Sequence, residues 1–171
     1  MNEVIQNIKT RRSVRSFTDK RISDEDLREI AEAGMFAPSG MNRQTWQFTV
    51  VHNQEKIKAL AAAIAEVLGR SGYNFYTPDA LIIPSNVADS AWGRDDNACA
   101  LQNIFLAAHS LGIGSVWINQ LRDICDNPKI RPLLRDLGIP DNHIVYGLAA
   151  LGYAASAPKE IAHKEAIVFV K

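Results

Sequence analysis

Apolar residues recur at helical spacing along five stretches of the chain. Helices are predicted over residues 2–10, 23–35, 54–68, 95–111 and 128–137. Ser23 and Asp26 form a capping-box signature at the start of the second stretch. Residues 95–111 carry apolar side chains on more than one side of the helix, which predicts a central, buried position.

Runs of β-branched, aromatic and other apolar residues predict short strands between these helices. The predicted strands cover residues 46–52, 80–87, 114–119, 143–152 and 167–170. Pro84 has no backbone N–H to donate, so we expect an edge position or a bulge there. Strands and helices do not alternate as in a doubly wound sheet, which favours an α+β fold with an antiparallel or mixed sheet packed by helices. With no repeat and no long linker, we expect residues 1–171 to form one domain.

Composition narrows the class of protein. The 171 residues are 47% hydrophobic and 22% charged, as in globular proteins. Nineteen basic and 19 acidic residues cancel, so no overall field attracts nucleic acid or a membrane surface. The apolar stretch 147–155 is far shorter than the ~20 residues of a membrane helix, and the first residues lack an apolar signal core. The two cysteines suit a reducing compartment, so we expect a cytoplasmic protein with Cys99 in the core and Cys125 partly exposed.

Positive charge is concentrated near the start of the chain. Residues 1–21 hold six basic and two acidic side chains, a net charge of +4. In the segment 11–15 (RRSVR), arginine forks and the Ser13 hydroxyl follow a predicted helix and suit a phosphate group. A solvated basic turn is the alternative interpretation.

A second polar segment, residues 38–44 (PSGMNRQ), links a predicted helix to a predicted strand. Gly40 allows the backbone to approach a ligand closely. Ser39, Asn42 and Gln44 offer uncharged donors and acceptors, which suit a polar heterocycle better than a metal ion. The alternative is a connector whose polar side chains satisfy its own backbone.

The sequence lacks the motifs of several other kinds of functional site. No phosphate-binding GxxxxGK[ST] loop and no GxSxG elbow occurs. The LGIGSVW segment at 111–117 follows a helix instead of a strand, which excludes a Rossmann fingerprint. The four histidines are not spaced as metal ligands, so we expect no metal site. A redox cofactor is the natural carrier of any reaction.

Read together, four segments resemble the nitroreductase family of FMN-dependent oxidoreductases. They are RRSVRSF, APSGMNRQTW, NIFLAAHSLGIGSVWI and VYGLAALGY. They follow one another in the family's order, and the resemblance extends over nearly the whole chain. The resemblance implies an α+β homodimer with two FMN sites at the subunit interface. It also implies hydride transfer from NAD(P)H to FMN and then to a nitroaromatic, a quinone or a similar acceptor.

The resemblance also implies roles for particular residues, none of them a catalytic acid, base or nucleophile. The FMN phosphate and ribityl end would be held by Arg11, Arg12, Ser13 and Arg15. The partner subunit's loop would line the flavin with Pro38, Ser39, Gly40 and Asn42, and Gln44 belongs to the same loop. Asn74 would meet the pyrimidine edge, and the backbone amides of Asn119 and Gln120 the reactive nitrogen.

Two departures from the family pattern concern the phosphate. Relatives have a proline where Ala154 follows Tyr153, and an arginine near the position of Ile161. Lys159 is the candidate replacement for that arginine. For the dimer we expect apolar contacts near Leu101 and Phe105 and in the segment 167–170.

Two other kinds of function stay open at this point. One is a flavin-binding module without turnover, such as an FMN carrier or sensor, or a relative that consumes its own flavin. The other is a nucleic-acid binder that uses the basic segment, although no aromatic residues are interleaved with its charges.

Overall fold

The structure, a computed structural model, describes residues 2–164 and 166–171. The helices are α1 (Glu3–Thr10), α2 (Asp24–Met35), the 3-10 helix η1 (Gly40–Asn42), α3 (Gln54–Leu68), α4 (Gly93–Ser110) and α5 (Arg131–Asp136). The strands are β1 (Trp46–Val51), β2 (Ala80–Val87), β3 (Gly114–Ile118), β4 (His143–Ile144) and β5 (Leu148–Gly152). The prediction for α3 matches its bounds, and Ser23 is the N-cap of α2, where its hydroxyl accepts the Asp26 N–H at 3.0 Å.

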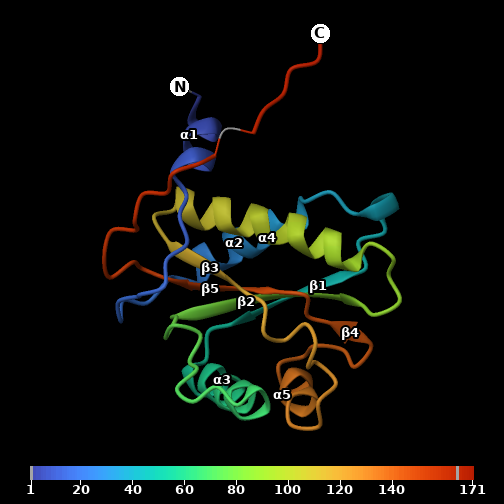
Figure 1. The fold of residues 1–171 in the computed structure, drawn as a ribbon. Coiled ribbons are helices and arrows are strands. Elements are labelled where there is room, and N and C mark those ends of the chain that lie inside the picture. Colours follow the sequence, from blue (N-terminus) through green and yellow to red (C-terminus); the bar gives the residue numbers. More distant parts are fainter. Residues whose placement is uncertain (1, 165) are drawn as a thin grey trace.

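The five strands form one sheet in which all paired strands are antiparallel. The order is β1-β2-β5-β3, and β4 pairs with the far end of β2. Helices α2 and α4 cover one face of the sheet, and α3 and α5 cover the other (Figure 1). The predicted α+β fold with a mostly antiparallel sheet is therefore confirmed.

Both faces of the sheet are buried, which explains why its strands are apolar without a polar side. Along β2, Leu81 and Ile83 enter the core beside α3 and α5, whereas Ala80 and Ile82 enter the core beside α2 and α4. Successive side chains of a strand point to opposite faces, so one apolar run supplies both cores.

Pro84 lies inside a central strand, contrary to our expectation of an edge or a bulge. On one side of β2 the register with β1 is continuous, and Pro84 is opposite Phe48. On the other side, β2 pairs with β5 only as far as Ile82 and with β4 only from Asn86 onward. The residue without an N–H thus falls where that side of the strand has no paired neighbour.

Three other predicted elements differ from the structure. The helix predicted at 128–137 begins only at Arg131, after a series of turns. The strand predicted at 143–152 is divided into β4 and β5. Residues 167–170 do not form a strand.

Helix α4 is central, as predicted, and packs against α2 and against β2, β3 and β5. Leu101 and Phe105 are 0% and 4% exposed because they are covered within the chain, so these two side chains leave almost no surface of their own for a subunit interface. The two cysteine predictions were wrong, because Cys99 is on the exposed side of α4 and Cys125 is buried.

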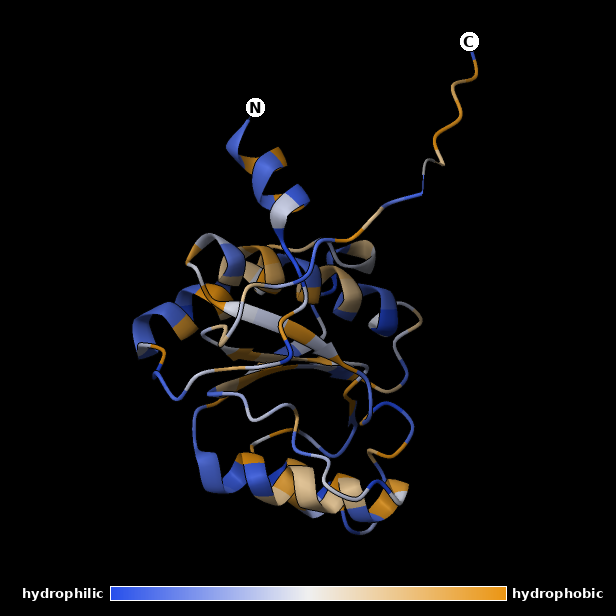
Figure 2. Ribbon diagram, turned by 60° about the vertical axis from the view of Figure 1, so that its left-hand side comes forward, coloured by the Kyte–Doolittle hydropathy of each residue, from blue (hydrophilic) through white to orange (hydrophobic). Residues whose placement is uncertain are grey.

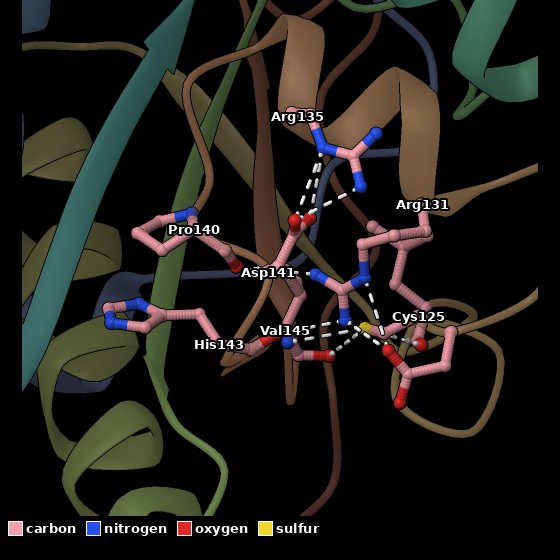
Figure 3. A network of polar contacts seen from close by, with 9 residues as sticks. Cys125, Arg131, Arg135, Pro140, Asp141, His143 and Val145 are labelled. Carbon is pink, nitrogen blue, oxygen red and sulfur yellow. Dashed lines mark hydrogen bonds and ion pairs between the residues drawn. The ribbon is translucent and has the colours of Figure 1, made fainter.

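A buried arginine organises the connection that leads to β5 (Figure 3). Arg131 pairs with Asp126 at 2.7 Å and donates to the carbonyl oxygen of His143 at 3.1 Å. Beside it, the Cys125 thiol accepts the backbone N–H of Val145 at 3.3 Å, and burial raises the pKa of this thiol. Burial thus favours the neutral thiol, which packs in the core beside α5.

Helix α1 and the last part of the chain lie outside the two cores. No residue of α1 is buried, and its apolar Val4, Ile5 and Ile8 are exposed. The chain after Tyr153 passes α1 and leads away from the sheet, and its end is apolar (Figures 1 and 2). None of the helices formed by the described residues is both long and apolar enough to cross a membrane.

Candidate functional site

The basic segment leaves α1 and attaches to the edge of the sheet. Arg11 is the C-cap of α1, and Ser13 forms a parallel bridge with Ser115 of β3. The Val14 N–H donates to the Ser115 carbonyl at 2.9 Å. A Cβ on Gly114 would lie 2.9 Å from the Val14 side chain, so only glycine allows this close approach.

Arg11 is a half-buried cation without an acidic partner. Its guanidinium carbon lies 5.9 Å from the centre of the Phe105 ring, and burial, assisted by the neighbouring Arg12 charge, lowers its pKa. Within residues 2–164 and 166–171, no carboxylate oxygen lies within 4.0 Å of it. Among the described residues outside the segment 11–15, four arginines form ion pairs, namely Arg21, Arg122, Arg131 and Arg135, and the other four, Arg28, Arg43, Arg70 and Arg94, are exposed to solvent. Arg11 is therefore suited to an external anion.

The other members of the basic segment have different surroundings. Arg12 donates to the carbonyl oxygens of Lys9 and Arg11 at 2.6 and 2.8 Å, and so it caps the C-terminal end of α1. Arg15 is exposed. Burial and the charges of Arg11 and Arg12 lower the pKa of His109, whose ring lies 2.9 Å from the Thr10 hydroxyl. The surface around Arg11 and His109 therefore carries positive charge that nearby acidic side chains do not fully neutralise.

A cleft of about 540 Å³ separates α1 from the passing C-terminal segment. It is lined by Ile8, Lys9, Arg11, Arg12, Ile161 and His163. Lys159, the predicted phosphate ligand, is exposed and does not line this cleft. The structure brings Ile161 and His163 to the arginines in its place.

The second predicted segment forms a tight loop around η1. Pro38 and Asn42 are exposed, and the Ser39 hydroxyl accepts the Gln44 N–H at 3.3 Å. The Gln44 side chain donates to Asn42 Oδ1 at 2.7 Å. Polar side chains of this loop therefore do satisfy one another, as the connector interpretation proposed, but Asn42 and Gln44 also remain open to solvent.

The two segments lie at opposite ends of α4. Arg11 of the basic segment lies over Phe105, and the preceding Thr10 contacts His109, toward the C-terminal end of α4. The loop meets the N-terminal end, where the Gly40 N–H donates to Asp96 Oδ1 at 2.8 Å. Asp96 and His109 are 13 residues apart on one helix, which corresponds to about 20 Å.

Two of the remaining predicted residues, Asn119 and Gln120, lie at the end of β3, next to Tyr73. Asn119 and Gln120 follow this strand, and Gln120 Oε1 accepts both the Asn119 N–H at 3.1 Å and the Tyr73 hydroxyl at 3.2 Å. Asn74, the neighbour of Tyr73, is exposed and accepts the Tyr76 N–H at 3.0 Å. Asn74 lines a groove beside α3 together with Tyr73 and Gln54, and the Asn119 backbone N–H that was expected to face the flavin already has an acceptor.

Sequence reasoning missed the residues that hold these segments in place. Tyr73 was not singled out, nor were Trp92 and Asp96 at the start of α4. An acidic residue in the first turn of a predicted helix was a signal for Asp96, although such residues usually serve the helix itself. Trp92 gave no separate signal.

Comparison with known proteins places the chain in a family. The nitroreductase family model matches residues 8–153, and the chain belongs to this family. A crystal structure of a nitroreductase with bound FMN from Bacteroides fragilis is 44% identical, with a TM-score of 0.93 over 99% of each chain.

Two curated relatives carry names that describe an activity. A protein of Archaeoglobus fulgidus, provisionally named NADH dehydrogenase/NAD(P)H nitroreductase, is 37% identical over 90% of this chain and 86% of its own. The NADPH-flavin oxidoreductase of Vibrio harveyi is 32% identical over 93% of this chain and 69% of its own.

Proposed function

We propose that the chain is an FMN-dependent oxidoreductase that takes reducing equivalents from NAD(P)H and passes them to a small organic acceptor such as a nitroaromatic or a quinone. The names and titles of its relatives include a nitroreductase with bound FMN and an NADPH-flavin oxidoreductase, which support the cofactor and the reductant. We further propose that residues 1–171 act as one FMN-binding unit in the cytoplasm.

The observation that carries the proposal is the half-buried Arg11 without a carboxylate partner. A desolvated guanidinium next to Arg12 is stabilised by a dianion, and the FMN phosphate is one. Ser13 supplies a hydroxyl one residue beyond, at the edge strand. The donor set therefore fits the phosphate end of FMN.

The separation of the two polar segments supports a homodimer with shared sites. The two segments lie toward opposite ends of α4, and the resemblance to the family assigns them to opposite subunits, so the loop 38–44 of one subunit would complete the basic segment of the other. A two-fold axis would then produce two equal sites from one interface. Apolar surface is available to such an interface on α1, and Phe169 near the end of the chain is 83% exposed.

The chain's own residues have a binding and positioning role in this proposal. When bound, FMN would supply the hydride-transfer chemistry. Arg11 and Ser13 would hold its phosphate end, Asn74 would orient its pyrimidine edge, and the backbone of Asn119 and Gln120 would border its reactive edge. We assign no proton-transfer step to a side chain.

The visible absorption spectrum of the purified protein tests the proposal. We expect one FMN per chain, weaker binding of FAD, and rapid bleaching of the flavin by NADH or NADPH without oxygen, followed by recovery when a quinone is added. Bound FMN that neither nucleotide bleaches would favour the carrier or sensor function. Failure to bind FMN would refute the proposal.

A further inference from the structure

The loop 38–44 is held by the start of α4, through contacts with the indole ring of the N-cap residue Trp92 and with Asp96 in the first turn. The Trp92 side chain lies against Gly40 so closely that a Cβ on Gly40 would be 2.5 Å from its Cγ and Cδ2 atoms. The guanidinium carbon of Arg43 lies 5.4 Å from the centre of the Trp92 ring. One turn further along, Asp96 Oδ1 accepts the Gly40 N–H at 2.8 Å.

This loop needs such support because its backbone is strained. Met41, Asn42 and Gln44 have φ angles of 55°, 53° and 48°. Residues other than glycine adopt this left-handed backbone conformation at a cost of about 1–2 kcal/mol per residue. Such conformations persist only where surrounding contacts determine them.

The contacts of Asp96 indicate that its part in this support is specific. Asp96 is only 5% exposed although it is acidic. Its hydrogen bond with the Gly40 N–H joins two residues that are 56 positions apart in the sequence. The adjacent Asp95 also lies in the first turn of α4 but is exposed. Both carboxylates interact favourably with the dipole at the N-terminus of α4, but only Asp96 also accepts a hydrogen bond from the loop 38–44.

We propose that Asp96 and Trp92 are positioning residues that shape the loop 38–44 for the flavin site of the partner subunit. The inference rests on the proposed function. It adds that residues on α4 of one chain control cofactor binding by the other chain, without touching the cofactor. The effect is therefore expected in trans.

The first experiment separates the loop from the fold. Asp96→Ala should accelerate amide hydrogen exchange of the peptide containing Gly40 in the flavin-free protein, and should weaken FMN binding at least about tenfold. Asp96→Asn keeps an acceptor oxygen and should restore most of the affinity. Asp95→Ala is the matched control and should change neither measurement. Trp92→Ala should resemble Asp96→Ala, whereas Trp92→Phe, which keeps an aromatic ring, should have a smaller effect.

The second experiment tests the trans effect with heterodimers of an Arg11→Gln chain and an Asp96→Ala chain, isolated through two different tags. If Asp96 acts on the partner's site, both substitutions fall on the same site, and the other site has an intact Arg11 and an intact loop. Each heterodimer then binds one FMN with wild-type affinity. If Asp96 acts on its own chain's site, both sites are damaged and no high-affinity site remains, which overturns the proposal.

The remaining outcomes are equally distinct. Unchanged exchange at Gly40, or unchanged FMN affinity, in both Asp96→Ala and Trp92→Ala overturns the proposal while the proposed function stands. A wild-type protein that binds no FMN overturns the proposed function, and this inference with it.

Discussion

Replacing Arg11 by glutamine should weaken binding of FMN far more than binding of riboflavin, which lacks the phosphate. Charge-assisted hydrogen bonds contribute roughly 1.5–3 kcal/mol each. At 1.4 kcal/mol per tenfold change, losing one such bond raises the dissociation constant about 10- to 150-fold. Since the Arg11 guanidinium is only half-buried, solvent screens part of this interaction, and we expect the dissociation constant for FMN to rise about 10- to 30-fold.

The flavin-free protein supplies an independent measurement for the same variant. Arg11 is desolvated without a carboxylate partner among the described residues, so Arg11→Gln should not lower the thermal midpoint of the apoprotein. Fluorescence titrations with both flavins measure the affinities, and Arg135→Gln, at an ion pair with Asp141, is the control. Equal losses of FMN and riboflavin affinity would show that Arg11 does not hold the phosphate.

Three further predictions follow from particular contacts. Gly40→Ala should abolish tight FMN binding and shift the Trp92 fluorescence, because its Cβ would lie 2.5 Å from the indole ring; wild-type affinity would contradict a role of the Gly40–Trp92 contact in FMN binding. In an NMR titration, FMN should raise the pKa of His109 by neutralising the nearby arginine cations, and riboflavin should not; equal shifts would contradict a phosphate at this site. Burial lowers the pKa of His143, so the folded state binds fewer protons, and stability should fall as the pH drops below the ordinary histidine value of about 6.5. In urea unfolding, His143→Gln should reduce this dependence and the exposed His163→Gln should not, whereas an unchanged pH profile in His143→Gln would refute the assignment.

Local patterns predicted the elements well where one periodicity extended over the whole element. The stretch from Gln54 to Leu68 has helical apolar spacing throughout, and α3 has these bounds. The run from Ala80 to Val87 is a strand of the predicted length. In both cases the core depends on spacing along the chain, which the sequence contains.

Predictions failed where the outcome depends on a distant neighbour. The missing N–H of Pro84 is visible in the sequence, but the gap between β5 and β4 beside it is a property of the sheet. Likewise, Cys99 is exposed because the apolar side of α4 already faces α2 and the sheet, and the helix spacing alone did not reveal which side that is. An isolated apolar segment such as 167–170 has no partner strand among the described residues of one chain.

The same limit applied to the candidate site. The motifs drew attention to two polar segments, and the resemblance predicts that they come from two subunits. The sequence did not reveal that Arg12 caps α1, or that Gln120 occupies the Asn119 amide. Such contacts depend on side-chain conformations between neighbours in space, which no motif records.

The position of exposed apolar side chains supports an interface that passes through both halves of the proposed site. Leu101 and Phe105 are buried within the chain, so a dimer must use other apolar surface. Phe36 and Met41 are 86% and 76% exposed at the loop end of α4, and Val4 is 64% exposed on α1 at the other end. Large exposed apolar groups gain free energy when a partner covers them. Because they flank the loop and the basic segment, the contact that covers them is also the contact that would bring the two segments together.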